Sequence, residues 1–366
     1  MSKKTRSAGS RIILTFDYRL TLLLLLCFCM AKKTVYWHEC DNGKIKCDLC
    51  PRGCLLDEGQ RGFCFVRGRQ NNEIVLHAYG KTSGIAVDPI EKKPLNHFYP
   101  NSKVLSFGTA GCNLGCKFCQ NWDISKSRET EILSRKVSPD EMVKLAVLNK
   151  CKSIAFTYND PVIFLEYAAD IANLARLQGI QTVAVTAGYI NPEPRKEFFS
   201  FIDAANVDLK SFNPDFYSKF CSAELAPILE TLEYIKKETN VWLEITTLLI
   251  PGENDSSEEI DQMTRWIAQT LGPSVPVHFS AFHPAWKVTN KERTPVSTLK
   301  RSREIAIKNG LYYVFTGNVH DPEGASTYCH NCKKPIIKRD WYELLEFNLE
   351  KDGKCKFCGT QCYGRF

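Results

Sequence analysis

The stretch Gly111-Cys112-Asn113-Leu114-Gly115-Cys116-Lys117-Phe118-Cys119 decides the expected chemistry and fold of this chain. It places three thiols within eight residues, and its glycines let the backbone wrap closely around an inorganic cluster. Three cysteine ligands for a cluster of four irons leave one iron with an open coordination position. We therefore predict a [4Fe–4S] cluster on Cys112, Cys116 and Cys119. The alternative is a zinc knuckle that adds a distant fourth ligand.

From Val104 onward, short apolar strands alternate with amphipathic helices, which is the signature of βαβ units and a parallel sheet. Polar residues follow nearly every strand at its carboxyl end, where (β/α) barrels carry their active sites. We therefore expect an α/β fold with a partial (β/α)6-type barrel rather than a doubly wound sheet. The expected strands are 104–107, 153–157, 181–186, 206–210, 241–250, 275–281 and 311–315.

Local signals mark helix ends and one irregular segment. The sequence Ser138-Pro139-Asp140-Glu141 predicts a helix start, with Ser138 as N-cap and Glu141 completing a capping box. Gly179 and Gly310 stand where helices are expected to end. The stretch 71–103 is rich in turns and prolines, so we expect an extended lead-in to the barrel there.

Two further cysteine groups flank the expected barrel. The N-terminal group predicts a small metal-stapled module, and its spacing leaves zinc and a second iron–sulfur cluster both open. The C-terminal group has the spacing of a zinc ribbon. The N-terminal group is Cys47, Cys50, Cys54 and Cys64, and the C-terminal group is Cys329, Cys332, Cys355 and Cys358. We interpret the isolated Cys151 and Cys221 as buried core thiols.

Composition bounds the class of protein and its location. The 44% hydrophobic and 24% charged residues are typical of a globular chain rather than a membrane or disordered one. The 48 basic residues only slightly exceed the 41 acidic ones and are scattered, so we expect neither nucleic-acid nor membrane binding. The 17 cysteines occur mostly in short-spaced groups typical of metal ligation, which requires a reducing compartment. We therefore predict a cytoplasmic protein.

The first residues resemble a secretory signal, because Lys3, Lys4 and Arg6 precede an apolar run from Leu20 to Ala31. This run is too short to span a bilayer. We interpret Met30 as the residue at which translation begins. Residues 1–29 would then result from a start codon that was assigned too far upstream. The expected organisation is then an upstream-start extension or signal-like segment at 1–30, a cysteine-rich module at 31–70, the barrel with its lead-in at 71–325 and a zinc-ribbon-like module at 326–366.

The CxxxCxxC loop, with an aromatic residue before its last cysteine, resembles the radical S-adenosylmethionine (SAM) superfamily. Such enzymes cleave SAM reductively, and the resulting 5′-deoxyadenosyl radical removes hydrogen from a substrate. Further segments resemble a narrower group, the radical SAM component of the AmmeMemoRadiSam system, which is related to glycyl-radical-enzyme activases such as pyruvate formate-lyase activating enzyme. The likeness covers about residues 31–366 and includes Cys47-Asp48-Leu49-Cys50-Pro51, Asp88 through Pro94, Cys119-Gln120-Asn121, Tyr158-Asn159-Asp160-Pro161 and Thr316-Gly317-Asn318.

The resemblance implies a set of SAM-binding residues. The turn from Thr157 to Pro161 stands where the family contacts the SAM amino group, although the family commonly has Glu where this chain has Asp160. Asp208 and Lys210 stand where the family meets the methionine end, and we predict both as catalytic residues. Side chains two apart on a strand share one face, so both can point into the barrel. The predicted cofactor-binding residues are Tyr158, Asn159, Asp160, Thr186, Asp208 and Lys210.

Other interpretations of these residues stay open. Asp208 and Lys210 also fit a buried ion pair that organises the barrel interior. His278 and His283 fit ordinary histidines near the barrel rim as well as a role against SAM or substrate.

The resemblance also implies partners: SAM, an electron donor such as flavodoxin or ferredoxin, and Memo-type and AMMECR-type proteins. Two other functions remain open at this point. One is an activase that installs a glycyl radical on a large partner enzyme. The other is a zinc-stabilised interaction or nucleic-acid-binding protein in which all three cysteine groups are structural.

Overall fold

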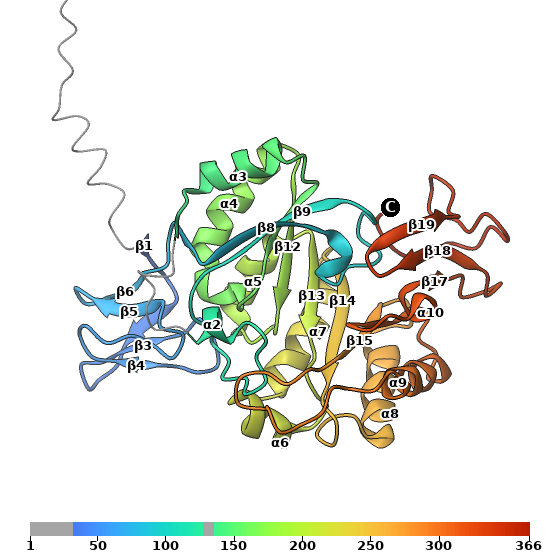
Figure 1. The fold of residues 1–366 in the computed structure, drawn as a ribbon. Helices are drawn as coiled ribbons and strands as arrows, with labels where there is room; N and C mark the ends of the chain where they lie inside the picture. The colour runs from blue at the N-terminus through green and yellow to red at the C-terminus, as the bar shows by residue number, and fades with distance from the viewer. Residues whose placement is uncertain (1–31, 127–134) are drawn as a thin grey trace, which may run out of the picture.

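The centre of the molecule is an eight-stranded sheet in the order β16-β15-β14-β13-β12-β11-β9-β8 (Figure 1). The structure is a computed structural model that describes residues 32–126 and 135–366, so the predictions for residues 1–30 lie outside the described residues. Neighbouring strands from β9 to β16 are parallel. The edge strands β8 and β16 do not pair with each other within the described chain, so the sheet is open, as expected for a partial barrel.

All seven predicted barrel strands are present. Their bounds are Lys103–Gly108 (β9), Ser153–Phe156 (β11), Gln181–Thr186 (β12), Ala204–Asp208 (β13), Trp242–Leu249 (β14), Val277–Ala281 (β15) and Val314–Gly317 (β16). The eighth strand, β8 (Gly84–Pro89), was not predicted and pairs antiparallel with β9. It lies in the segment interpreted as an extended lead-in. A proline is tolerated in β8 because the strand has a partner on one side only.

Helices connect the parallel strands, and the one predicted helix start, at Ser138, is present. The side-chain hydroxyl of Ser138 accepts a hydrogen bond from the Glu141 backbone N–H, and the Glu141 carboxylate accepts one from the Ser138 N–H. Gly179 and Gly310 lie just beyond the ends of α4 and α9, as predicted. The longer helices are Pro139–Leu148 (α3), Leu165–Leu177 (α4), Pro192–Ser200 (α5), Ala226–Glu238 (α7), Ser257–Trp266 (α8) and Val296–Lys308 (α9).

The sequential strand order explains where the site can form. When each crossover helix returns to the neighbouring strand in the same direction, the helices cover one face of the sheet. The apolar sides of these helices and the strands form one continuous buried core. The helices leave the other face of the sheet uncovered. The polar residues predicted after the strands lie on that side, at the carboxyl ends of the strands.

Smaller sheets flank the two ends of the large one (Figure 1). On the N-terminal side are the sheets β1-β6-β5 and β2-β3-β4, and on the C-terminal side is β17-β18-β19. The C-terminal sheet packs through Ile336 and Ile337 on Tyr313 and Phe315, which lie just before and within β16. The bounds are Lys32–Lys33 (β1), Trp37–Glu39 (β2), Ile45–Cys47 (β3), Leu55–Leu56 (β4), Arg67–Gln70 (β5), Glu73–Leu76 (β6), Thr327–Tyr328 (β17), Pro335–Asp340 (β18) and Glu343–Phe347 (β19).

Residues 97–99 and 363–365 form a belt near the amino ends of β9 and β14. The Tyr99 N–H donates to the Arg365 carbonyl at 2.6 Å, and the Arg365 N–H donates to the His97 carbonyl at 2.8 Å. The Arg365 guanidinium also donates to the Asn240 carbonyl, just before β14, at 2.6 Å. Across the described ranges, we find no helix with the length and apolar character needed to cross a bilayer.

Candidate active site

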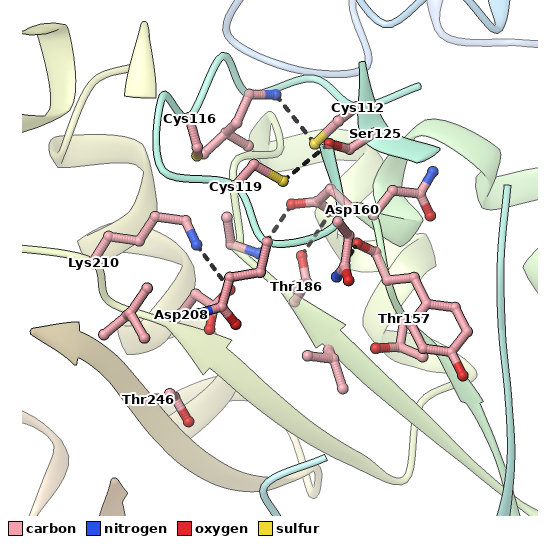
Figure 2. A pocket seen from close by; sticks show the side chains of 18 of the residues that line it. Cys112, Cys116, Cys119, Ser125, Thr157, Asp160, Thr186, Asp208, Lys210 and Thr246 are labelled. Atoms are coloured by element: carbon pink, nitrogen blue, oxygen red, sulfur yellow. Dashed lines mark hydrogen bonds and ion pairs between the residues drawn. The ribbon is translucent and has the colours of Figure 1, made fainter. Parts of the chain in front are cut away.

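The carboxyl ends of the parallel strands surround a cavity of about 290 Å³ (Figure 2). Cys112, Cys116 and Cys119 line one end of it. The structure brings all six predicted cofactor-binding residues to the same cavity, namely Tyr158, Asn159, Asp160, Thr186, Asp208 and Lys210. Residues that follow strands far apart in sequence therefore share one space, as the (β/α) pattern predicted.

The central cysteine loop follows β9 and is held by backbone contacts with residues 220–221. Gly115 and Lys117 donate their N–H groups to the carbonyls of Cys221 and Phe220, at 2.7 and 2.8 Å. The Cys112 sulfur accepts the Leu114 N–H at 3.5 Å. Burial raises the pKa of the Cys112 thiol to about 12. An unpaired thiolate is therefore costly here, and a bound metal centre would remove that cost.

Cys221 is a fourth cysteine at this loop, which the sequence did not reveal. Its thiol interacts with the Cys116 thiol, and this interaction lowers the pKa of Cys116. On the other side of the loop, the Cys119 sulfur lies 3.0 Å from the Ser125 hydroxyl. No local pattern links Cys221 to the triplet, because it lies more than a hundred residues away in the chain.

The donor set fits an iron–sulfur cluster better than a single ion. One tetrahedral ion with Zn–S bonds of about 2.3 Å requires thiol sulfurs within about 4 Å of one another. In the parts of the chain that the structure describes, only Cys329, Cys332, Cys355 and Cys358 have all their sulfurs within 4.8 Å of one another. The central cysteines are spread more widely around open space, as ligands on different corners of a cluster are.

Asn159 holds the entrance of the cysteine loop. Its side-chain N–H groups donate to the Thr109 hydroxyl at 3.0 Å and to the Gly111 carbonyl at 2.8 Å. Its side-chain oxygen accepts the Thr109 N–H at 3.2 Å. Asn159 lies at the cavity wall as predicted, but its side-chain amide forms hydrogen bonds to other residues of the protein.

Asp160 ties two strand ends together. Its carboxylate accepts a hydrogen bond from the Val162 N–H at 3.1 Å. It also accepts hydrogen bonds from the Thr186 hydroxyl and the Ala187 N–H, both at 2.9 Å (Figure 2). Burial raises the pKa of Asp160, although these donors oppose the shift. The shape of the wall around Thr186 therefore depends on Asp160.

Tyr158 connects the cavity to the Asp88–Pro94 segment. Its backbone φ is +69°, and its carbonyl accepts the Asn121 side-chain N–H at 2.9 Å. The Lys93 ammonium lies 5.5 Å from its ring centre and 2.7 Å from the Asp88 carboxylate. Burial alone would raise the pKa of Asp88, but Lys93 and Lys92 lower it to about 2.

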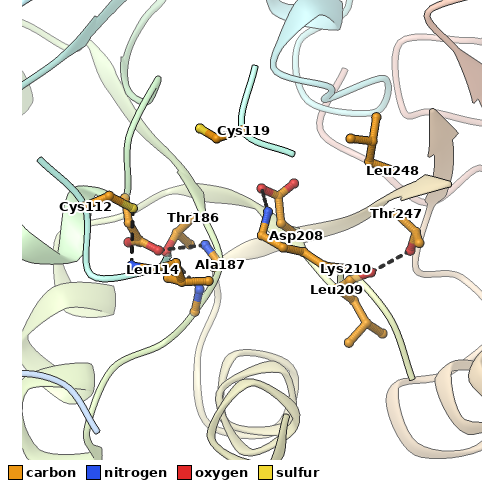
Figure 3. Close-up of polar contacts among 12 residues, drawn as sticks. Cys112, Leu114, Cys119, Thr186, Ala187, Asp208, Leu209, Lys210, Thr247 and Leu248 are labelled. Atoms are coloured by element: carbon orange, nitrogen blue, oxygen red, sulfur yellow. Dashed lines mark hydrogen bonds and ion pairs between the residues drawn. The ribbon is translucent and has the colours of Figure 1, made fainter. Parts of the chain in front are cut away.

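Asp208 and Lys210 form an ion pair of 2.8 Å at the cavity, close to the central cysteines (Figure 3). Leu209, between them, is fully buried in the core, as the alternation of a strand predicts. Burial acts to lower the pKa of Lys210, but Asp208 and the neighbouring Cys116 raise it well above its usual value. Lys210 is therefore a permanent cation in the cavity, and Asp208 retains about a third of its side-chain exposure.

The two histidines are placed differently. His278 is buried, lies 2.6 Å from the Glu244 carboxylate and stacks on Phe315, so it has protein partners on both sides. His283 lies at the rim, 3.2 Å from the Gln120 side-chain nitrogen. Sequence reasoning missed several other lining residues, namely Lys92, Ser125, Lys126, Thr246, Ser280 and Asn318.

The C-terminal cysteine group closes into a compact set. The sulfurs of Cys329 and Cys358 lie 3.6 Å apart, and those of Cys332 and Cys355 lie 3.8 Å apart. These distances match four thiolates on one tetrahedral ion. The group is a candidate metal site separate from the cavity.

Comparisons with known proteins agree with this geometry. A family model described as the Radical SAM superfamily matches residues 107–267. The uncharacterized protein MJ0808 of Methanocaldococcus jannaschii is 41% identical over 331 residues, which are 90% of this chain and 98% of that protein. The pyruvate formate-lyase-activating enzyme of Listeria monocytogenes is 25% identical over 215 residues, 55% of this chain and 86% of the enzyme.

Among solved structures, a radical SAM methyltransferase from Sphaerobacter thermophilus aligns with a TM-score of 0.47 and 17% identity, over 82% of this chain and 81% of that chain. The identification rests on the family model and the sequence relatives. The chain belongs to the radical SAM superfamily and is a SAM-dependent radical enzyme related to the activating enzymes of glycyl-radical enzymes.

Proposed function

We propose that Cys112, Cys116 and Cys119 hold the [4Fe–4S] cluster of this enzyme and that SAM binds in the adjoining cavity. The observation that carries this proposal is that the three thiols, Asp208 and Lys210 line one cavity. When bound, the cluster and SAM supply reductive cleavage of a carbon–sulfur bond and a 5′-deoxyadenosyl radical that abstracts hydrogen from a substrate.

Charge in the cavity supports a zwitterionic ligand. The SAM methionine end carries an ammonium and a carboxylate, and the cavity offers the Asp208 carboxylate and the Lys210 ammonium 2.8 Å apart. We propose that each pairs with the opposite charge of the ligand and so orients it. Tyr158 and Thr186 line the same wall, while Asn159 and Asp160 keep that wall and the cysteine loop in place.

We propose that the reaction is of the AmmeMemoRadiSam type. The motifs at residues 47–51, 88–94 and 316–318 support this proposal. Its partners would be a flavodoxin or ferredoxin together with Memo-type and AMMECR-type proteins. The relationship to pyruvate formate-lyase-activating enzymes favours a second candidate, an activase that installs a glycyl radical on a partner enzyme. Deuterium transfer from labelled candidate partners into 5′-deoxyadenosine separates the two.

We further propose zinc for the C-terminal cysteine group and a cytoplasmic location. Zinc is supported by the compact spacing of the four sulfurs. A reducing location is supported by the fifteen cysteines of the described chain, all of which carry free thiols.

The test is anaerobic reconstitution of the full chain and of Cys116→Ala, with Cys151→Ala as a matched buried-cysteine control away from the cavity. We expect wild type and the control to bind iron at the central site and release 5′-deoxyadenosine from SAM under reduction, whereas Cys116→Ala should lose the iron of the central site and release none. Full turnover by an iron-loaded Cys116→Ala protein would refute the ligand assignment. In Asp208→Asn, SAM affinity should fall more than iron content, and an equal loss of both would show a structural ion pair instead.

A further inference from the structure

The N-terminal cysteines surround an enclosed void. Cys47, Cys50, Cys54 and Cys64 all line a cavity of about 20 Å³ between the small β2-β3-β4 sheet and the barrel. Its remaining lining includes the apolar Leu49, Leu56, Phe63 and Ile163 and the cations Arg52 and Arg67. The convergence of four thiols on one void points to an inorganic ligand, and the two guanidinium groups would offset the negative charge of a thiolate-bound centre.

A backbone N–H group reaches sulfur in this module as it does in the central loop. The Cys54 sulfur accepts the Phe63 N–H at 3.4 Å. The same pattern occurs at Cys112, which accepts the Leu114 N–H. Hydrogen bonds to sulfur are one of the ways in which proteins tune metal–thiolate centres.

The separation of the sulfurs distinguishes a cluster from one ion. The C-terminal group brings its four sulfurs within 4.8 Å of one another, and in the described ranges it is the only cysteine group that does so. The N-terminal sulfurs line a void instead, as those of the central group do. Ligands of a cluster bind different iron atoms, so they do not need to gather around one point as the four ligands of a zinc ion do.

The N-terminal group also shares a wall with the central cysteine loop. Asn113, next to Cys112, lines the N-terminal void. The Arg52 Nε donates to the Asn113 carbonyl at 2.5 Å, and a Cβ placed on Gly111 would lie 2.0 Å from the Cys64 carbonyl oxygen. Only one layer of main chain and side chain separates the two groups.

We propose that Cys47, Cys50, Cys54 and Cys64 bind a second iron–sulfur cluster, fully ligated by protein, which exchanges single electrons with the central metal site. A low-potential donor gives one electron to the N-terminal cluster, which then gives one electron to the central metal site. No covalent bond forms or breaks in either step. Because all four ligands are cysteines, this cluster has no open iron for SAM. The transfer of the electron to the central site rests on the function proposed above, whereas the proposal of a metal site at the N-terminal cysteines does not.

The test uses the full chain, purified and reconstituted anaerobically, with iron, sulfide and zinc counted per chain. Three variants are compared with wild type: Cys50→Ala/Cys64→Ala, Cys112→Ala/Cys116→Ala/Cys119→Ala, and the nearby control Cys40→Ala. If both sites hold four-iron clusters, wild type and the control should contain about eight irons, and each multiple variant about four. The triple variant should keep an electron paramagnetic resonance signal on reduction.

Two results would overturn the proposal. One is wild type with about four irons that are all lost in the triple variant. The other is a zinc content that falls by one ion in the Cys50/Cys64 variant while its iron content is unchanged. If circular dichroism shows that the Cys50/Cys64 variant does not fold, the iron content of the triple variant decides between the outcomes, because its N-terminal cysteines are intact. Full iron loading without SAM cleavage would refute the proposed function but leave the second cluster standing.

Discussion

Replacing Asn159 by alanine tests how the cysteine loop is held. The substitution removes three buried hydrogen bonds, two to the Thr109 backbone N–H and hydroxyl and one to the Gly111 carbonyl, with lengths of 3.2, 3.0 and 2.8 Å. At about 1 kcal/mol of net stability for each bond, the free energy of unfolding should fall by about 3 kcal/mol. The loss falls on the residues just before Cys112, so iron loading should fall as well.

The assay is urea unfolding of the iron-free protein at neutral pH, followed by iron analysis after anaerobic reconstitution. Asn149→Ala is the matched control, because Asn149 makes one exposed side-chain bond, to the Leu145 carbonyl at 2.8 Å. It should lose no more than about 0.5 kcal/mol. An Asn159→Ala protein as stable as Asn149→Ala would refute the hydrogen-bond reasoning. Normal iron content in a destabilised variant would refute the link to the loop.

Three further predictions concern single residues. Gly111→Ala should destabilise the protein by far more than Gly179→Ala in thermal unfolding, because both have positive φ but only the Gly111 Cβ would overlap the Cys64 carbonyl. Burial lowers the pKa of His97 to about 4, so the free energy of unfolding should fall by up to about 3 kcal/mol between pH 6.5 and 4, and His97→Gln should flatten that slope in urea titrations. Cys221→Ser should keep wild-type iron content, because we interpret Cys221 as a neighbour of Cys116 and not as a ligand, and loss of iron would make it a ligand.

Much of the fold was predictable because it depends on short-range patterns. The alternation of apolar strands and amphipathic helices placed all seven parallel strands, and the capping box placed the start of α3. The edge strand β8 was missed, because Pro89 and the turn-rich residues around it are atypical of strands. Its pairing with β9 is a tertiary effect that no local pattern encodes.

The candidate site was predictable in position but not in contacts. Residues after strand ends were expected to meet, and the six predicted cofactor-binding residues line one cavity. The side chains of Asn159 and Asp160 turned out to bond to the protein, because a motif fixes where a residue lies and not which neighbours its side chain meets. Cys221 was missed for the same reason, since it reaches Cys116 only through the fold.

The belt of residues 97–99 and 363–365 determines where this open sheet is free to flex. It links main-chain atoms just before β9 to the C-terminal segment 363–365, and through Arg365 to the start of β14, so the amino-terminal side of the sheet resists separation of its strands. We therefore expect any movement that widens the cavity for a bulky substrate to occur at the carboxyl ends of the strands. Protection of backbone amides from deuterium exchange should accordingly be greater on the amino-terminal side of the sheet than at those carboxyl ends.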